Sequence, residues 1–279
     1  MGVGESGAIP HNPEGCASPW IFVPGDADGR VDGLETNGRG REHAVKAFLL
    51  AAGHGTRLRP LTDTIPKCLV PIQGEPMLAI WLQYCHRLGI DEVLINLHAN
   101  AAPVREFLRQ NAPAIPVRTV EERHLLGSAG TLRANRDWVA SDDCFWIFYA
   151  DVLSCADFDG MLRLHRDRRP VATLGVYEVA DPQRCGIVTT NANGVIEQFV
   201  EKPVKPPGNL AFSGLMIGTP EMLSAIPEQT PVDIGSHVLP LLAGRMFAFR
   251  IHDYLIDIGT MENYRKAQAT WPGFPERLS

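Results

Sequence analysis

The chain has 279 residues, which is enough for one large domain or two small ones. Hydrophobic residues make up 45% of it, an ordinary share for a soluble globular protein, so a sizeable core is possible. The formal net charge of −6 argues against binding nucleic acid through a broad basic surface, and no apolar run approaches the roughly 18 residues of a membrane helix.

The six cysteines are scattered, and no two of them have the Cys-x-x-Cys spacing of a zinc or redox motif. We therefore expect free thiols, a reducing compartment and a cytoplasmic protein. Residues 1–43 are rich in Gly, Pro, Asp and Asn and lack hydrophobic periodicity, which is typical of a disordered N-terminal extension. We expect residues 44–279 to form a single domain.

Over the first half of that domain, hydrophobic patterns alternate between strand and helix. Strands are predicted at 47–50, 93–97, 117–120 and 145–149, and helices at 76–87, 104–109, 128–135 and 158–167, with Ser128 as a helix cap. This order predicts an α/β fold with a Rossmann-like, doubly wound, mostly parallel sheet. Ligands bind such sheets at the carboxyl ends of the strands.

The second half is dominated by closely spaced strand patterns. Strands are predicted at 171–176, 187–190, 195–201 and 210–217, and Asn193-Gly194 predicts a tight hairpin turn between two of them. This pattern predicts a mixed β region in the second half of the domain.

The loop after the first predicted strand has the composition of a phosphate-binding turn. Arg57 follows the loop directly and Lys67 comes ten residues later, so a planar fork of donors and a compact positive charge are close in sequence. Glycines in the loop add no bulk between backbone N–H groups and phosphate oxygens. The predicted nucleotide-binding residues of the loop are Ala51, Ala52, Gly53, Gly55 and Thr56.

Two common phosphate motifs do not fit this stretch. A Walker A loop cannot start at Gly53, and Leu58 stands where a dinucleotide fingerprint needs glycine. The loop, Arg57 and Lys67 together are typical of a triphosphate site.

Residues 48–78 resemble the G-x-G-T-R-L-x-P-L-T…P-K-x-L-x-P signature of sugar-1-phosphate nucleotidylyltransferases, and the likeness extends over residues 46–270. The resemblance implies the nucleotide-diphospho-sugar transferase type of fold. It also implies that a sugar or cyclitol 1-phosphate attacks a nucleoside triphosphate and releases pyrophosphate. Many relatives form dimers or higher oligomers, so we expect a homo-oligomer.

Two aspartates follow apolar runs that should deliver them to the edge of the core. Asp151 comes just after the strand at 145–149, and Asp257 follows Tyr254-Leu255-Ile256. On the residues alone, a helix cap and a turn residue are equally good interpretations. The resemblance makes the two aspartates the family's Mg²⁺ pair, and oxygen ligands suit Mg²⁺. It assigns catalytic roles to Arg57, Lys67 and Asp151.

The acceptor side is expected around Glu201-Lys202-Pro203. On the residues alone, this segment could be an exposed strand end. The resemblance makes Lys202 the catalytic contact to the sugar phosphate and Glu201 a ligand of sugar hydroxyls, and it extends the acceptor site to Gly186, Asn209 and Gly214. Cys185, Phe212 and Leu255 depart from the family pattern. We therefore expect a hexose-like acceptor other than plain mannose 1-phosphate, or a cyclitol analogue.

Residues 121–132 resemble the E-x-x-x-L-G-T-A-G segment of mannose-1-phosphate guanylyltransferases. The resemblance implies that Glu121 accepts hydrogen bonds from guanine, while Gly127 and Ser128 let the backbone approach base and ribose. An ordinary helix start is the alternative. GTP is the favoured donor, with UTP or dTTP as alternatives, and a catalytically silent sensing subunit is a rival to the enzyme.

Overall fold

The computed structural model describes residues 45–53, 55–98 and 100–275. The prediction for residues 1–43 lies outside the described residues, as does His54 of the phosphate loop.

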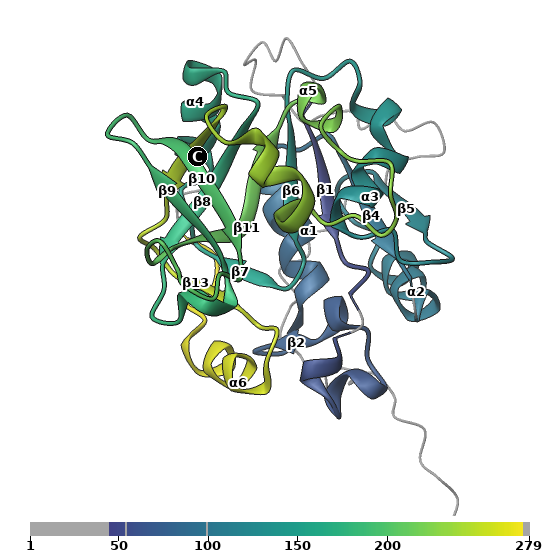
Figure 1. Cartoon of the computed structure of the whole chain (residues 1–279). Coiled ribbons are helices and arrows are strands. Elements are labelled where there is room, and N and C mark those ends of the chain that lie inside the picture. Colours follow the sequence, from purple (N-terminus) through teal and green to yellow (C-terminus); the bar gives the residue numbers. More distant parts are fainter. Residues whose placement is uncertain (1–44, 54, 99, 276–279) are drawn as a thin grey trace, which may run out of the picture. The chain divides into compact units, whose positions relative to one another are not determined.

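Among the described residues, nine strands form one mixed sheet in the order β5-β4-β1-β6-β11-β8-β12-β10-β9 (Figure 1). Their bounds are β1 Lys46–Leu50, β4 Glu92–Leu97, β5 Val117–Glu121, β6 Phe145–Tyr149, β8 Ala172–Glu178, β9 Gly186–Thr190, β10 Val195–Glu201, β11 Leu210–Gly218 and β12 Met246–Arg250.

The first four strands of that order run parallel to one another. β1 lies between β4 and β6, so the chain winds outward in one direction through β4 and β5 and then returns to the other side of β1 with β6. This reversal leaves a crevice at the carboxyl ends of β1 and β6, the usual ligand position in doubly wound sheets. The predicted fold class is confirmed.

The second half brings antiparallel pairing into the sheet, as predicted. β11 runs antiparallel to both β6 and β8, and β9 and β10 form an antiparallel hairpin whose turn contains Gly194 at φ 83°. Two small ribbons lie outside the main sheet: β2 (Pro71–Ile72) with β3 (Glu75–Pro76), and β7 (Val152–Ser154) with β13 (Leu255–Asp257). Neither ribbon was predicted as paired strands.

The helices are α1 Met77–Arg87, α2 Ala101–Asn111, α3 Ser128–Ala134, α4 Phe158–Arg168, α5 Pro220–Leu223 and α6 Met261–Thr270. α2 is longer than the predicted 104–109, because it begins right after Asn100, whose φ of 61° reverses the chain. Ser128 is not the cap of α3: Gly127 occupies that position, and the Ser128 hydroxyl instead donates to Asp233. The sequence after Gly218 has no recognisable hydrophobic periodicity, so its short helices and turns were not predicted.

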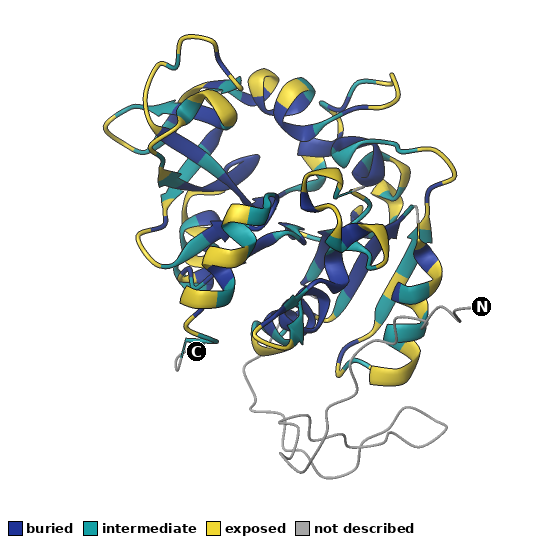
Figure 2. Ribbon diagram, turned by 90° about the horizontal axis from the view of Figure 1, so that it is seen from below, coloured by how far each residue is buried: buried dark blue, intermediate teal, exposed yellow. Residues whose placement is uncertain are grey.

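Side chains alternate between the two sheet faces, and each face has its own core. Ala47 and Leu49 of β1 join residues of α1, α2, α4 and α6 in one core. Phe48 joins residues of α3, α5 and the turn at 234–242 in the other. Figure 2 shows buried residues along the sheet, with exposed residues concentrated on the outer helices and loops.

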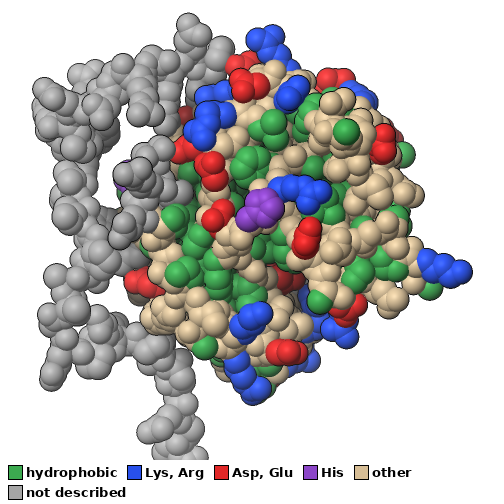
Figure 3. Space-filling model, turned by 90° about the vertical axis from the view of Figure 1, so that its left-hand side faces the viewer, with side chains coloured by type: hydrophobic (Ala, Val, Ile, Leu, Met, Phe, Trp, Pro, Cys, Tyr) green, Lys and Arg blue, Asp and Glu red, His purple; other side chains and the backbone are tan. Residues whose placement is uncertain are grey.

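The described cysteines are all free thiols. Burial raises the pKa of Cys68, next to Lys67, to about 12, so this thiol is a packing residue. Among the described residues, none of the helices is both long and apolar enough to cross a membrane. On the face in Figure 3, acidic and basic side chains are interspersed among hydrophobic ones.

The aromatic cluster under β6 supplies a test of the core. Phe148 is fully buried and stacks on Trp81 and Trp146, with ring centroids 4.6 and 5.2 Å away. We expect Phe148→Ala to lower the free energy of unfolding by about 3–5 kcal/mol, because the ring leaves a cavity in a packed interior. Chemical denaturation measures this, and Leu241→Ala is the control, since Leu241 is 63% exposed and its loss should cost less than about 0.5 kcal/mol.

Candidate functional site

The two predicted metal aspartates lie side by side although 106 residues separate them in the chain. Asp151 connects β6 to β7, and β13 pairs antiparallel with β7 so that Asp257 stands opposite Val152. The Ile258 N–H donates to the Asp151 carbonyl at 2.9 Å, which extends this pairing by one residue. The β7–β13 ribbon therefore fixes both carboxylates at the carboxyl end of β6.

Two cations approach these carboxylates. The Lys67 ammonium forms an ion pair with Asp151. The Arg57 guanidinium lies on the Asp257 side, because a Cβ built on Gly259 would be 2.9 Å from Arg57 Nη2 and 2.8 Å from Asp257 Oδ1. The structure thus brings Arg57, Lys67, Asp151 and Asp257 into one cluster, which we call the carboxylate–cation cluster.

Burial and the neighbouring Asp151 carboxylate raise the pKa of Asp257 above its usual value. Lys67, the Gly259 N–H and Arg57 oppose this change, in that order. The Gly259 N–H donates to Asp257 Oδ1 at 2.6 Å. Burial is thus the main reason that the charged form of Asp257 is disfavoured, and the Asp151 carboxylate adds to it.

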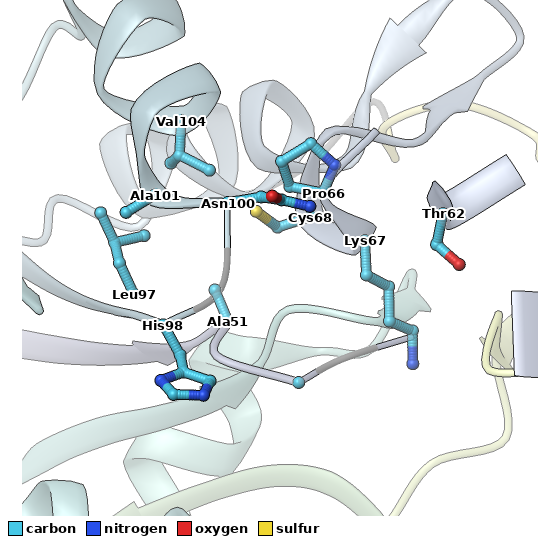
Figure 4. Close-up of a pocket in the computed structure, with 11 residues that line it drawn as sticks. Ala51, Thr62, Pro66, Lys67, Cys68, Leu97, His98, Asn100, Ala101 and Val104 are labelled. Carbon is cyan, nitrogen blue, oxygen red and sulfur yellow. The ribbon is translucent and has the colours of Figure 1, made fainter. Parts of the chain in front are cut away.

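The phosphate loop lies next to this cluster. Gly55 has φ 63° and starts a short 3₁₀ turn, Thr56–Leu58, and its carbonyl accepts a hydrogen bond from the Thr62 hydroxyl at 2.8 Å. A side chain on Gly55 would crowd Thr62 and Lys67, whereas Gly53 has open space where its Cβ would be. Ala51 and Gly53 line a small pocket together with Lys67 (Figure 4). The loop thus leaves room for a ligand beside its backbone.

A buried carboxylate ties this loop to the segment after β5. The Ala51 N–H donates to Asn96 Oδ1 at 2.7 Å, and Asn96 Nδ2 donates to Glu122 Oε1 at 2.9 Å. The Thr131 hydroxyl donates to the same Glu122 oxygen, and the Leu126 N–H donates to the other at 3.0 Å. Glu122 therefore positions the phosphate loop, the 122–126 loop and α3 at once.

The adjacent glutamate has a different environment. Glu121 ends the edge strand β5, is half-exposed, and forms an ion pair with Arg105 of α2. The role of Glu121 toward guanine stays a prediction. The sequence reasoning missed Glu122, although Glu122-x-x-x-Leu126-Gly127 has the spacing of the E-x-x-x-L-G segment. It also missed His98, which lines the pocket in Figure 4 and whose Nδ1 donates to the Glu122 carbonyl at 2.7 Å.

Gly127 and Ser128 contact the chain itself. A Cβ on Gly127, which has φ 80°, would lie 2.3 Å from the Val232 carbonyl oxygen, so only glycine fits. That carbonyl accepts from the Ala129 and Gly130 N–H groups at 3.0 and 3.1 Å. In this structure the start of α3 therefore holds the segment around Val232, and its contact with base and ribose stays a prediction.

The predicted acceptor residues come together in part. Glu201 ends β10 opposite Gly186, and its Oε1 is 3.1 Å from Lys202 Nζ. Lys202 has φ 45°, and its N–H donates to the Cys185 carbonyl at 3.0 Å, which turns the chain beside the cluster. Gly214 packs against Tyr149 at the end of β6.

No contact of Asn209 with Glu201 or Lys202 is seen in the described part of the chain. Asn209 precedes β11 on an exposed loop, where its carbonyl accepts from the Val179 N–H at 2.9 Å. Its role in sugar binding stays a prediction.

The acceptor residues lie next to the carboxylate–cation cluster. The Cys185 thiol is close enough to both Asp257 and Glu201 that each carboxylate raises its pKa, after the larger effect of burial. Asp257 of the carboxylate–cation cluster and Glu201 are thus both within electrostatic range of the same thiol.

A doubly wound sheet with a glycine-containing loop, cations and paired carboxylates at the carboxyl ends of its strands defines a nucleotide-binding α/β protein. Residues 46–272 match the family described as Nucleotidyl transferase, and the chain belongs to that family. The sequence-based recognition of this family is confirmed.

The chain is 32% identical over 232 residues to mannose-1-phosphate guanylyltransferase of Mycobacterium tuberculosis, covering 81% of this chain and 64% of that protein. It is 30% identical over 226 residues to the catalytic subunit beta of mannose-1-phosphate guanylyltransferase of Xenopus tropicalis, covering 79% and 62%. The chain thus spans somewhat less than two thirds of the length of these curated relatives. HddC of Yersinia pseudotuberculosis superposes with a TM-score of 0.70 at 25% identity, over 81% of this chain and 99% of that chain.

The Glu122 network generates a stability test. Asn96 and Thr131 donate to Glu122 Oε1, and the Leu126 N–H donates to Oε2. Replacement by Gln turns one of these oxygens into an N–H₂ group, so at least one buried donor loses its acceptor. We expect Glu122→Gln to lower the free energy of unfolding by about 1–3 kcal/mol in chemical denaturation. Glu121→Gln is the matched control, because its exposed ion pair is worth at most about 1 kcal/mol. Equal effects of both substitutions would contradict the positioning role of Glu122.

The raised pKa of Asp257 generates a pH test. Since the folded protein holds this proton more tightly than the unfolded chain, folding stability falls as pH rises from the unfolded carboxyl value through the raised one. Asp257→Asn removes the free-energy cost of ionising this carboxyl group in the folded protein, and it keeps an acceptor for the Gly259 N–H. With a chelator present, we expect the variant to have a higher Tm than the parent at pH 7, and no advantage below about pH 3.

The exposed Asp253 is the control for this measurement, and Asp253→Asn should shift stability by less than about 0.5 kcal/mol at either pH. A lower Tm of Asp257→Asn at pH 7 would mean that Lys67 and Arg57 outweigh burial and Asp151.

Proposed function

We propose that the protein is a sugar-1-phosphate nucleotidylyltransferase. It transfers a nucleotidyl group from a nucleoside triphosphate to a sugar or sugar-like 1-phosphate and releases pyrophosphate. The observation that carries the proposal is the carboxylate–cation cluster at the carboxyl end of β6, with the phosphate loop on one side and Glu201-Lys202 on the other. A binding module for one nucleotide would have no use for the second side.

The reaction needs positioning and charge neutralisation more than it needs a base. A phosphate monoester has its second pKa near about 6, so the attacking oxygen is largely ionised at pH 7. Lys202 would hold the acceptor phosphate, while Arg57 and Lys67 would bind the triphosphate. These contacts would align the acceptor oxygen with the α-phosphorus and stabilise the charge that develops on the leaving pyrophosphate.

Mg²⁺ fits the residues that are present. Asp151 and Asp257 offer carboxylate oxygens beside the β7–β13 ribbon, and a bound cation would offset the burial and the Asp151 charge that raise the pKa of Asp257. Within the described residues no group of three or more His, Cys, Asp or Glu side chains forms a metal site, so water and phosphate oxygens would complete the coordination. When bound, Mg²⁺ would neutralise phosphate charge and orient the triphosphate.

GTP is the donor we propose. Supporting this, the relatives from Mycobacterium tuberculosis and Xenopus tropicalis are named mannose-1-phosphate guanylyltransferases, and HddC has been crystallised with GMP-PN. UTP is the alternative, since UTP-bound UGPase from Acinetobacter baumannii has a similar fold at 21% identity and a TM-score of 0.70. Homo-oligomerisation and a cytoplasmic location remain part of the proposal.

A regulatory subunit that senses nucleotide sugars is the rival function. Loss of phosphate- or metal-binding residues would favour it, but Arg57, Lys67, Asp151, Asp257 and Lys202 are all present. Catalysis is therefore the better supported function.

Pyrophosphate release tests the proposal. The assay crosses GTP, UTP, dTTP, ATP and CTP with a panel of sugar and cyclitol 1-phosphates in the presence of Mg²⁺. Release that requires both one triphosphate and one acceptor is expected. No release with any pair, despite nucleotide binding, would favour the sensor.

Lys67→Ala should lower kcat/KM by at least about a hundredfold, because the triphosphate loses its most buried cation. Lys266→Ala on exposed α6 is the charge-matched control and should leave the rate unchanged. Full turnover of Lys67→Ala would refute the assigned role.

A further inference from the structure

The carboxylate of Glu201 occupies a slot between two glycines. One oxygen, Oε1, pairs with Lys202, and the other, Oε2, faces the glycines. A Cβ built on Gly186 would lie 2.8 Å from Glu201 Oε2, and a Cβ built on Gly235 would lie 2.6 Å from it. Real Cβ atoms do not approach oxygen this closely, so the carboxylate can stand here only because both positions lack a side chain.

The two glycines come from unrelated parts of the chain. Gly186 begins β9 and is the register partner of Glu201, whereas Gly235 belongs to the helical turn Ile234–Val238. Neither has a φ in the left-handed region, so the backbone itself would accept alanine at both positions. The constraint that excludes a side chain at Gly235 is therefore the position of Glu201.

The turn that carries Gly235 is held firmly. Asp233 Oδ1 accepts from the Ser236 N–H at 3.0 Å, and its Oδ2 accepts from the Ser128 hydroxyl at 2.7 Å. The Ile234 N–H in turn donates to that hydroxyl at 2.8 Å, and the Asp233 N–H donates to His237 Nδ1 at 3.0 Å. The hydrogen bonds of the Asp233 carboxylate are thus internal to the turn and α3, and Gly235 is fixed against Glu201.

We propose that Gly235 is a positioning residue of the acceptor site. Because it lacks a side chain, Gly235 leaves the Glu201 carboxylate room to stand where it can accept hydrogen bonds from ring hydroxyls of the acceptor. This inference rests on the proposed function.

The test compares two glycine substitutions with mannose 1-phosphate and the best acceptor from the pyrophosphate-release panel as probes. In Gly235→Ala the new methyl group displaces the Glu201 carboxylate, so KM for the acceptor should rise about tenfold or more while KM for the triphosphate stays within about twofold. Gly208→Ala is the matched control, because Gly208 is exposed and nothing lies within 4 Å of its Cβ position. An unchanged acceptor KM in Gly235→Ala would overturn the proposal.

A double-mutant cycle separates positioning from general damage. If Gly235 acts through Glu201, the alanine at 235 should change acceptor affinity by less than about twofold once Glu201→Ala has removed the carboxylate. Binding of mannose 1-phosphate to the triphosphate-loaded protein, measured by calorimetry, gives this value even where turnover is lost. Equal losses in both backgrounds would show that Gly235 acts on the fold and not on Glu201.

Retention of the triphosphate KM in Gly235→Ala shows that the variant folds, so a loss confined to the acceptor supports the proposal. Wild-type protein without turnover on any pair would instead refute the proposed function.

Discussion

The site depends on the pairing of β7 with β13. This ribbon is only three residues long on each side, yet it holds two carboxylates from distant parts of the chain against each other in a half-buried place. Burial and, after it, repulsion by the Asp151 carboxylate raise the pKa of Asp257. Lys67 and Arg57 offset part of the unfavourable energy of these two carboxylates. The sheet and its two cores provide the stability that compensates for the rest.

Hydrophobic periodicity predicted most of the strands and helices in the first half of the domain, and the ligand position in parallel sheets predicted where the site residues lie. The strand at 145–149 was placed at its observed bounds, and Asp151 was expected at the sheet edge because parallel strands deliver ligand-binding residues there. What local patterns could not supply was long-range pairing. β13 has three residues, and nothing near Asp257 in the sequence indicates that its partner is the chain just after Asp151.

The misplaced helix cap and the residues that were missed have a common physical origin. Ser128 has the residue type of a helix cap, but a tertiary partner, Asp233, takes its hydroxyl. Glu121 and Glu122 are the same residue type. Only the point at which β5 ends decides that the Glu122 side chain is buried while the Glu121 side chain is exposed. The constraint at Gly235 was likewise invisible, since it arises from Glu201, which is distant in the chain. Residues whose environment comes from another segment are the ones that sequence alone leaves ambiguous.

The Val232 carbonyl has a consequence for how charged substrates approach. It accepts hydrogen bonds from the Ala129 and Gly130 N–H groups at the start of α3. The partial positive charge at this end of the helix is therefore already paired within the protein. Under the proposed function, the triphosphate would therefore be attracted by Arg57 and Lys67 rather than by the start of α3.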